Sequence, residues 1–297
     1  MTAERLDRWL RAHHPSLSWA RIRNAIARGQ VTIDGAPARD PGLPVHESSE
    51  IEIDLSRRAK RTARIDLPRL YEDEEILVVD KPAGLLTIAS DAARRSTQDT
   101  VLRRVQEYSR HLHGRGAYAG MLHRLDRETS GALAVALSRE AHAAGRALFA
   151  GHEFERWYLA LVEGIPDRGE GTIDAPVSNR YVSGRRRIVR REQEGRPAVT
   201  HYRVRERFRD AAFVELQLET GRQHQIRLHL EQLGHPILGE RVYTGDAEGG
   251  RDRRAARVML HAWRLSFPHP LRRRRIVRAE APMPADFSVL LARLKRP

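Results

Sequence analysis

The sequence contains no cysteine, and this absence removes several classes of site at once. A chain without thiols forms no disulfide, carries no cysteine nucleophile and builds no zinc-thiolate centre. Long hydrophobic runs are absent too, so no segment is expected to cross a membrane. The first residues, MTAERLDRW, lack the apolar stretch of a signal peptide, and we therefore expect a cytoplasmic protein.

Acidic residues are outnumbered: 53 Lys and Arg stand against 39 Asp and Glu, which gives a net charge of +14. This balance favours a polyanionic partner, because neutralising phosphates releases counterions. A genome that prefers arginine codons would explain arginine in place of lysine, but it explains the basic excess less well. We expect nucleic acid before membrane as the partner. The 297 residues, 40% of them apolar, predict one large globular domain or two.

Residues 1–55 are predicted to form a compact unit of two short helices and a hairpin. A helix over 4–14 would present an apolar face made of Leu6, Trp9, Leu10 and His13. Ser18 is the expected N-cap of the second helix, with Ile22 and Ile26 turned inward. The hairpin turns at Asp34-Gly35, and IEIDL (51–55) adds an alternating strand.

Basic side chains are left free on both helices, which favours an RNA-binding surface over a merely solvated one. The arginines expected to contact RNA are Arg5, Arg8, Arg21, Arg23 and Arg28. The stretch RLDRWLRAHHPSLSWARIRNAIARGQVTIDG resembles the small RNA-binding domain first recognised in a ribosomal small-subunit protein, also called the alpha-L motif. That resemblance implies an αα-β RNA-binding domain at the N-terminus.

Two further basic segments have open interpretations. Residues 56–66 hold five basic residues before Asp66 and are predicted to be a linker that either touches phosphate or is solvated. GRRRIVRRE (184–192) lies between alternating strands. It is either a hairpin tip that reaches nucleic acid or a solvated loop.

Four distant stretches could build one active site, because sites draw residues from the ends of several elements. They are VVDKPAGLLT (78–87), HRLDRETSG (123–131), FERWYLALVEG (154–164) and LETGRQHQIRLHLEQLGHPILGE (218–240). In the last stretch, 223–233 is predicted to be a helix with Arg227 beside its core face, where a buried cation needs a carboxylate partner. Asp126 precedes a buried strand. On its own it could merely cap a turn, but an aspartate paired with arginine stays ionised and suits a nucleophile or general base.

Taken together, the four stretches resemble the RNA pseudouridine synthases of the RluA/RluD type, from about residue 66 to 288, with HRLDRETSG as the signature. The resemblance implies an α+β fold with a mixed, mostly antiparallel central sheet, placed after the small N-terminal RNA-binding domain. We expect domains at 1–55 and 67–297, joined by the basic linker 56–66.

The resemblance also implies roles for individual residues. Asp126 would attack the target uridine or deprotonate its ribose, and Arg227 would pair with Asp126. Tyr158 would stack on the extruded base and help move protons, while Arg124 would fill the space that the base leaves. The remaining candidates for substrate binding are His123, Arg222, Ile226 and Leu228, with Ile226 or Leu228 lining the uracil pocket. The family usually has lysine where Arg156 stands, which puts any role for a deprotonatable amine in doubt.

The chemistry agrees with this set of residues. Isomerisation breaks the bond between ribose C1′ and uracil N1 and rejoins the base through C5, so the nucleotide must leave the stack. An aromatic side chain can hold the flipped base, and a planar arginine can replace it. Nothing is oxidised and no group is brought in, so we expect no cofactor and no metal.

Rival functions explain fewer of these features. A metal hydrolase would have to use His201, His224 and His229, but there is no HExxH motif and the last two are five apart. A glycosidase-like pair of Asp126 and Glu128 is disfavoured by the surrounding arginines. A non-catalytic RNA-binding protein would not need HRLD, Tyr158 and Arg227 together. The N-terminal module favours ribosomal over transfer RNA as the target, and we expect a monomer.

Overall fold

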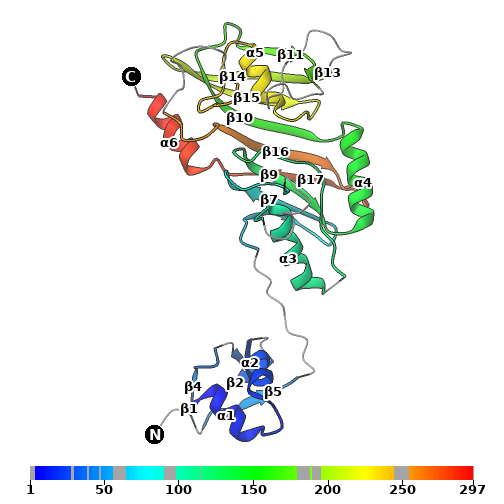
Figure 1. Cartoon of the computed structure of the whole chain (residues 1–297), viewed down its shortest axis with the longest axis vertical. Helices are drawn as coiled ribbons and strands as arrows, with labels where there is room; N and C mark the ends of the chain where they lie inside the picture. The colour runs from blue at the N-terminus through cyan, green and yellow to red at the C-terminus, as the bar shows by residue number, and fades with distance from the viewer. Residues whose placement is uncertain are drawn as a thin grey trace. The chain divides into compact units, whose positions relative to one another are not determined.

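The computed structural model describes residues 4–27, 30–38, 40–46, 48–55, 65–89, 98–114, 116–178, 188, 195–243 and 254–296. The chain divides into two compact units, Met1–Arg64 and Ile65–Pro297 (Figure 1). Within the described ranges, no helix combines the length and apolarity needed to cross a bilayer.

The first unit holds two helices and short strands. Its elements are β1 (Glu4–Arg5), α1 (Leu6–His13), α2 (Trp19–Ala27), β2 (Val31–Ile33), β3 (Ala36–Ala38), β4 (Pro44–Val45) and β5 (Ile51–Ile53). β1 pairs with β4, and β2 lies between β3 and β5, all antiparallel. The turn at Asp34-Gly35 has positive φ angles of 50° and 75°, as the hairpin prediction requires.

The apolar faces of α1 and α2 meet in one core, as their spacing predicts. Leu6, Leu10, Ile22 and Ile26 are fully buried. The backbone N–H of Arg21 donates to the Ser18 hydroxyl at 3.2 Å, which confirms the predicted N-cap.

The prediction for the first helix was wrong at two points. Residues 4–5 are not helical, because Glu4 and Arg5 pair with Pro44–Val45 as a strand. His13 is exposed and does not join the core; its ring stacks on Trp9 at 3.8 Å between centroids.

The second unit is built around a large sheet with helices packed on it. Its strands are β6 (Arg69–Glu72), β7 (Ile76–Lys81), β8 (Gly120–Met121), β9 (Ser130–Ala136), β10 (Glu155–Glu163), β11 (Glu170–Asp174), β12 (Val177–Ser178), β13 (Gly195–Arg196), β14 (Val199–Arg207), β15 (Ala211–Leu218), β16 (Leu260–Pro268) and β17 (Ile276–Glu280). Its helices are α3 (Val101–His113), α4 (Arg139–Ala150), α5 (Gln225–Gln232) and α6 (Ala285–Leu294).

Ten strands form the central sheet in the order β11-β14-β15-β10-β16-β9-β7-β6, with β17 on β16 and β8 on β9. Of these pairings, β16 with β9 is parallel and the others are antiparallel. The predicted mixed, mostly antiparallel sheet is therefore confirmed. Because β9 and β10 both flank β16, segments far apart in the sequence meet at the middle of the sheet (Figure 1).

The middle strands are buried on both faces. Ile76, Leu77, Val78 and Val79 are all inaccessible to solvent, as their continuous apolar run predicts. Side chains of β7 and β9 that share a face pack with the helix α4 and with aromatic rings, among them Phe154 stacked on Phe267. This core supports the loop between β8 and β9, which carries the HRLD motif.

Gly131, at the start of β9, allows that strand to approach β16. Its φ is +115°, and a Cβ there would lie 2.1 Å from the carbonyl oxygen of Ala262. Gly131→Ala is expected to destabilise the second unit by about 2 kcal/mol or more, because it combines backbone strain with a backbone clash. A fall of roughly 4 to 8 °C in Tm would accompany that loss.

Thermal unfolding followed by circular dichroism measures this effect. Gly84→Ala is the matched control, because Gly84 also has a positive φ (+86°) but a Cβ there meets no atom within 4 Å. Equal losses for the two variants would mean that strain alone, and not the contact between β9 and β16, sets the requirement for glycine.

Candidate active site

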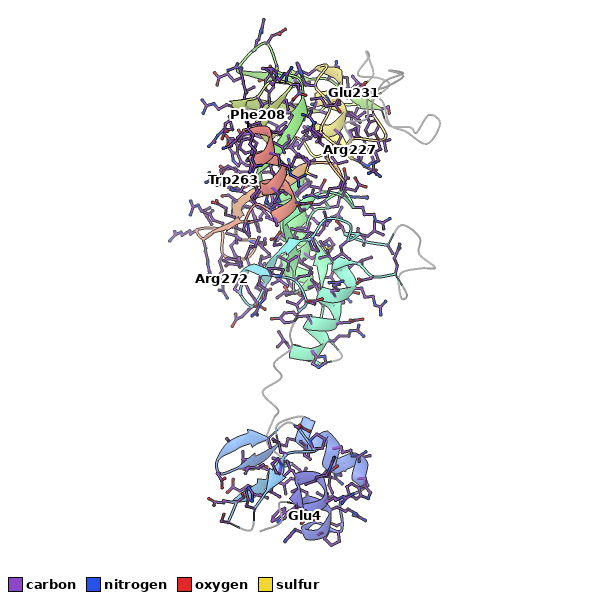
Figure 2. The ribbon with its side chains drawn as sticks, turned by 90° about the vertical axis from the view of Figure 1, so that its left-hand side faces the viewer. Glu4, Phe208, Arg227, Glu231, Trp263 and Arg272 are labelled. Atoms are coloured by element: carbon purple, nitrogen blue, oxygen red, sulfur yellow. The ribbon has the colours of Figure 1, made fainter. Side chains whose placement is uncertain are left out.

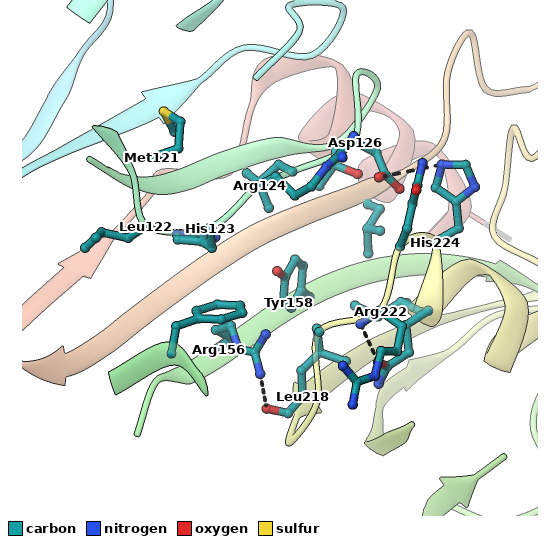
Figure 3. A pocket seen from close by; sticks show the side chains of 18 of the residues that line it. Met121, Leu122, His123, Arg124, Asp126, Arg156, Tyr158, Leu218, Arg222 and His224 are labelled. Carbon is teal, nitrogen blue, oxygen red and sulfur yellow. Dashed lines mark hydrogen bonds and ion pairs between the residues drawn. The ribbon is translucent and has the colours of Figure 1, made fainter. Parts of the chain in front are cut away.

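A cavity of about 350 Å³ opens where the β8–β9 loop, β10 and the start of α5 come together (Figure 3). That volume lies within the range of small-molecule binding sites. Its walls combine a carboxylate, several arginines and apolar side chains. The lining residues are Ile88, Met121, Leu122, His123, Arg124, Leu125, Asp126, Thr129, Arg146, Phe149, Ala150, Arg156, Tyr158, Leu218, Gly221, Arg222, Gln223, His224, Gln225, Ile226, Arg227 and Leu260.

Asp126 lines the cavity from a loop whose backbone is hydrogen-bonded on both sides of this residue. The Thr87 hydroxyl donates to the carbonyl of Leu125 at 2.7 Å, and the N–H of Thr129 donates to the carbonyl of Asp126 at 3.2 Å. The carboxylate itself remains 18% exposed. A rigid backbone with a reachable side chain is the arrangement that a nucleophile or base requires.

Lys81 is completely buried beneath this loop, a position that sequence reasoning did not assign. Its ammonium donates to the carbonyls of Pro82, Leu85 and Arg127 at 2.9, 2.8 and 3.0 Å. Burial lowers the pKa of Lys81 to about 7, although the nearby Asp126 carboxylate opposes that shift. The lysine joins the KPAG turn to the HRLD loop, and its position within a buried strand was the available signal.

Arg227 reaches Asp126 from α5, but its principal partner is another carboxylate. Its Nη1 lies 3.7 Å from Asp126 Oδ2, whereas its Nε and Nη2 donate to Glu240 at 2.6 and 2.7 Å. Glu240 is buried and also accepts the backbone N–H groups of Arg241 and Val242 at 2.9 and 2.8 Å. The predicted need for a carboxylate is therefore met mainly by Glu240, which sequence reasoning missed although GHPILGE contained it.

The His224 side chain also points toward Asp126 (Figure 3). Its Nε2 lies 3.7 Å from Asp126 Oδ1, and its Nδ1 lies 2.6 Å from the Tyr243 hydroxyl. The residue is the N-cap of α5 and has a left-handed backbone, with φ 60°. The prediction of a helix over 223–233 was thus too long at both ends, because this left-handed residue interrupts the helical backbone before Gln225 and α5 ends at Gln232.

Tyr158 lies on β10 in the cavity wall, two residues beyond Arg156. Burial raises the pKa of Tyr158 to about 12, with Arg156 opposing the shift and Asp126 adding to it. The hydroxyl is therefore protonated at neutral pH. Arg156 is buried, donates to the carbonyl of Glu219 at 3.0 Å and lies 4.8 Å from the Phe149 ring centroid.

The other predicted binding residues are divided between the cavity and the core. The cavity is lined by Arg124, Arg222 and Ile226. Arg124 is exposed, and Arg222 donates to the carbonyl of Pro197. Leu228 does not line the cavity: it is buried against Val177, Ala198 and Tyr243. Two positions along a helix turn the side chain by about 200°, so Ile226 and Leu228 cannot face the same space.

His123 orders the loop from inside. It is buried, its Nε2 accepts the backbone N–H of Ala134 at 3.1 Å, and its ring stacks on Phe149. Burial lowers the pKa of His123 to about 3, so the ring is neutral. It lines the cavity as a neutral, structurally engaged side chain.

The histidines weighed as metal ligands do not converge. His229 approaches the carbonyl of Ala175, and His201 approaches Thr172 and Glu219. Within the described part of the chain, no group of three or more potential ligands could hold a metal ion.

Of the arginines predicted to contact RNA, the four that the structure describes are exposed but not all free. Arg5 donates to the buried carboxylate of Asp7 at 3.2 Å, and Arg23 lies 3.6 Å from it. Arg8 and Arg21 are exposed. Arg28, residues 56–64 of the predicted linker 56–66 and nearly all of 184–192 lie outside the described residues.

In the second unit, Figure 2 shows Arg227 on α5 far from Arg272, which lies in the turn between β16 and β17. That turn carries four consecutive arginines, of which Arg272, Arg273 and Arg275 form ion pairs with acidic residues. The arginines that line the cavity are therefore a different set from the arginines of this turn.

Comparison with known protein families finds two matching parts of the chain. Residues 75–232 match the RNA pseudouridylate synthase family, and residues 4–51 match the S4 domain. The chain is 36% identical to ribosomal large subunit pseudouridine synthase D of Zymomonas mobilis over 310 aligned residues, which cover 99% of this chain and 95% of that protein. It is also 36% identical to the protein of the same name from Pseudomonas aeruginosa, covering 99% and 92%.

Among solved structures, the human RNA pseudouridylate synthase domain containing 4 superposes with a TM-score of 0.63 at 26% identity. The superposition covers 76% of this chain and 92% of that one. Human RNA pseudouridylate synthase domain containing 1 gives a TM-score of 0.57, also at 26% identity, and covers 78% and 96%.

Proposed function

The chain belongs to the RNA pseudouridine synthases of the RluA/RluD type, and we propose that its conversion of uridine to pseudouridine depends on Asp126. The observation that carries this assignment is the cavity in which the Asp126 carboxylate faces Arg227 and His224 at 3.7 Å, with Tyr158 in the wall. Asp126 bonds to the flipped uridine or removes a proton from its ribose. Either role needs an ionised carboxylate that RNA can reach.

The cationic partners of Asp126 support that role. Two hydrogen bonds hold the Arg227 guanidinium against the buried Glu240. The remaining nitrogen, Nη1, lies 3.7 Å from Asp126 and places a fixed positive charge beside that carboxylate. A charge held in place costs little reorganisation when charge moves in the reaction. Arg227 is therefore proposed to orient the Asp126 carboxylate.

Tyr158 and Arg124 are proposed to handle the extruded nucleotide. The Tyr158 ring offers a face on which a base can stack, an interaction worth roughly 1–3 kcal/mol. Arg124 is exposed beside the cavity, which suits a side chain that enters the gap in the RNA stack. Arg222 and Ile226 line the same space, and Arg156 supplies a buried positive charge there.

Tyr158→Phe separates stacking from proton transfer. The variant keeps the aromatic ring but loses a hydroxyl that is protonated at neutral pH and could move a proton. The rate of pseudouridine formation is therefore expected to fall by about 10²-fold or more. The Kd for RNA should stay within about twofold, because the ring that stacks on the base is retained. Single-turnover assays and filter binding measure the two quantities. A wild-type rate would confine Tyr158 to stacking.

Ribosomal RNA of the large subunit is the proposed target. The S4 domain supplies exposed arginines for phosphate contacts, and the two relatives above are named for that RNA. With this target we also expect a cytoplasmic location. The enzyme is proposed to need no cofactor and no metal, because isomerisation requires neither oxidation nor an incoming group. It is also proposed to act as a monomer.

Carbodiimide-stop sequencing of total RNA tests activity and target together. Deletion of the gene should remove stops at defined uridines of large-subunit ribosomal RNA, and the wild-type gene should restore them. Loss of stops in transfer RNA alone would replace the proposed target, and unchanged profiles in both RNAs would contradict the proposed activity.

A further inference from the structure

We propose that His224, oriented by the Tyr243 hydroxyl, is a positioning residue that holds one oxygen of Asp126 during the reaction. This inference rests on the proposed catalytic role of Asp126. His224 lies 3.7 Å from Asp126 Oδ1, while Arg227 approaches the other oxygen, Oδ2, at the same distance. The carboxylate is thus flanked by two side chains from α5 and its N-cap.

The tautomer of His224 follows from its two neighbours. An ionised carboxylate only accepts hydrogen bonds, so the nitrogen that faces Asp126 must carry a proton. That nitrogen is Nε2. In a neutral ring Nδ1 is then an acceptor, and the Tyr243 hydroxyl, 2.6 Å away, is the donor that fixes this state.

Burial lowers the pKa of His224, which supports the neutral ring at neutral pH. The charged groups around it oppose one another in their effects on this pKa: Asp126 and Glu240 raise it, whereas Arg227 and Arg124 lower it. His224 can therefore donate to Asp126 without adding a second full positive charge beside Arg227.

Tyr243 also contacts Arg227, the second side chain that flanks Asp126. The Arg227 guanidinium lies 5.1 Å from the centroid of its ring, and the His224 ring meets it edge-on at 5.5 Å. The backbone N–H of Tyr243 points to Glu240, 3.3 Å away. One buried tyrosine thus contacts both side chains that flank Asp126 and the carboxylate that holds Arg227.

The backbone of His224 is a second, independent observation. A left-handed conformation at a residue other than glycine is strained and persists where the surroundings impose it. Here the left-handed residue is the N-cap of α5, and its ring lies 3.7 Å from Asp126. At 3.7 Å the contact is longer than a hydrogen bond, and catalytic contacts commonly tighten once substrate is bound.

Two variants test the proposal on unmodified ribosomal RNA from a strain lacking the gene. His224→Asn suits the left-handed backbone but is too short to reach Asp126, and Tyr243→Phe keeps the ring under Arg227 but removes the donor. His224→Asn is expected to slow the single-turnover rate by about 10- to 100-fold, and Tyr243→Phe by a smaller factor. The Kd for RNA and the Tm should match those of the wild type.

His224→Gln provides the conservative rescue, since its amide nitrogen can donate from nearly the position of Nε2; its rate should return to within about threefold of the wild type. A wild-type rate for His224→Asn, or equally low rates for Asn and Gln, would overturn the proposal. Should His224→Asn also lower the Tm, a wild-type rate for Tyr243→Phe would overturn it. An inactive wild-type enzyme would instead refute the proposed function itself.

Discussion

Asp126→Asn is expected to reduce pseudouridine formation by at least about 10³-fold while RNA binding persists, because the amide can neither bond to the uridine nor take a proton. The substitution leaves the number of non-hydrogen atoms in the side chain unchanged. Because the carboxylate is partly exposed and its two flanking groups lie 3.7 Å away, little stability depends on it. The measurement is the single-turnover rate on unmodified ribosomal RNA, with filter binding and thermal melting on the same preparation.

Glu128→Gln is the matched control in the same loop. Its carboxylate accepts the backbone N–H of Val258 at 3.1 Å, and an amide oxygen can accept the same bond. We expect a rate within a few fold of the wild type, as for other substitutions that preserve a hydrogen bond. If Glu128→Gln were as inactive as Asp126→Asn, a pair of carboxylates would have to share the chemistry, and the single-aspartate mechanism would be wrong.

Glu240→Gln is expected to destabilise the second unit by about 3–5 kcal/mol, because it leaves the buried Arg227 without its charged partner. It should also slow the reaction, since a glutamine amide can accept only one of the two bonds, of 2.6 and 2.7 Å, that aim Arg227 at Asp126. Thermal and urea unfolding of the variant measure the first effect, and single-turnover kinetics at a temperature where it remains folded measure the second.

The pH dependence of stability gives a separate test of this ion pair. The hydrogen bonds from Arg227 keep the pKa of Glu240 below its ordinary value of 4.5, even though burial, the largest influence, acts to raise it. A carboxyl whose pKa is lowered in the folded state contributes stability above 4.5, and this stability is lost as pH falls through the lowered value. The free energy of unfolding of Glu240→Gln should therefore fall less steeply than that of the wild type below pH 4.5.

Glu231→Gln on α5 is the control for that comparison. Glu231 is half-buried, and burial raises its pKa, with the charge of Glu240 adding to the shift. Neutralising it is expected to leave stability unchanged or slightly higher. An equal loss of stability in both variants would show that any substitution near α5 is damaging and that the Arg227–Glu240 pair has no special weight.

Local patterns in the sequence determined the elements and the character of the site. The run Ile76–Val79 predicted a strand covered on both faces, Ser18 predicted a cap, and Asp34-Gly35 predicted a hairpin, because each depends on near neighbours. The HRLD stretch predicted that its loop carries the chemistry, and the structure places residues of that loop in the wall of the cavity. These inferences needed no knowledge of what packs where.

Only the tertiary structure decided which side chains of the site contact one another. Glu240 rather than Asp126 is the principal partner of Arg227, and Leu228 faces the core, because α5 has one fixed rotation against the sheet. Lys81 lies beneath the HRLD loop because β7 and β9 are neighbours, which no local pattern states. Which charges meet in a buried site depends on distances across the sheet, and the order of strands within that sheet sets those distances.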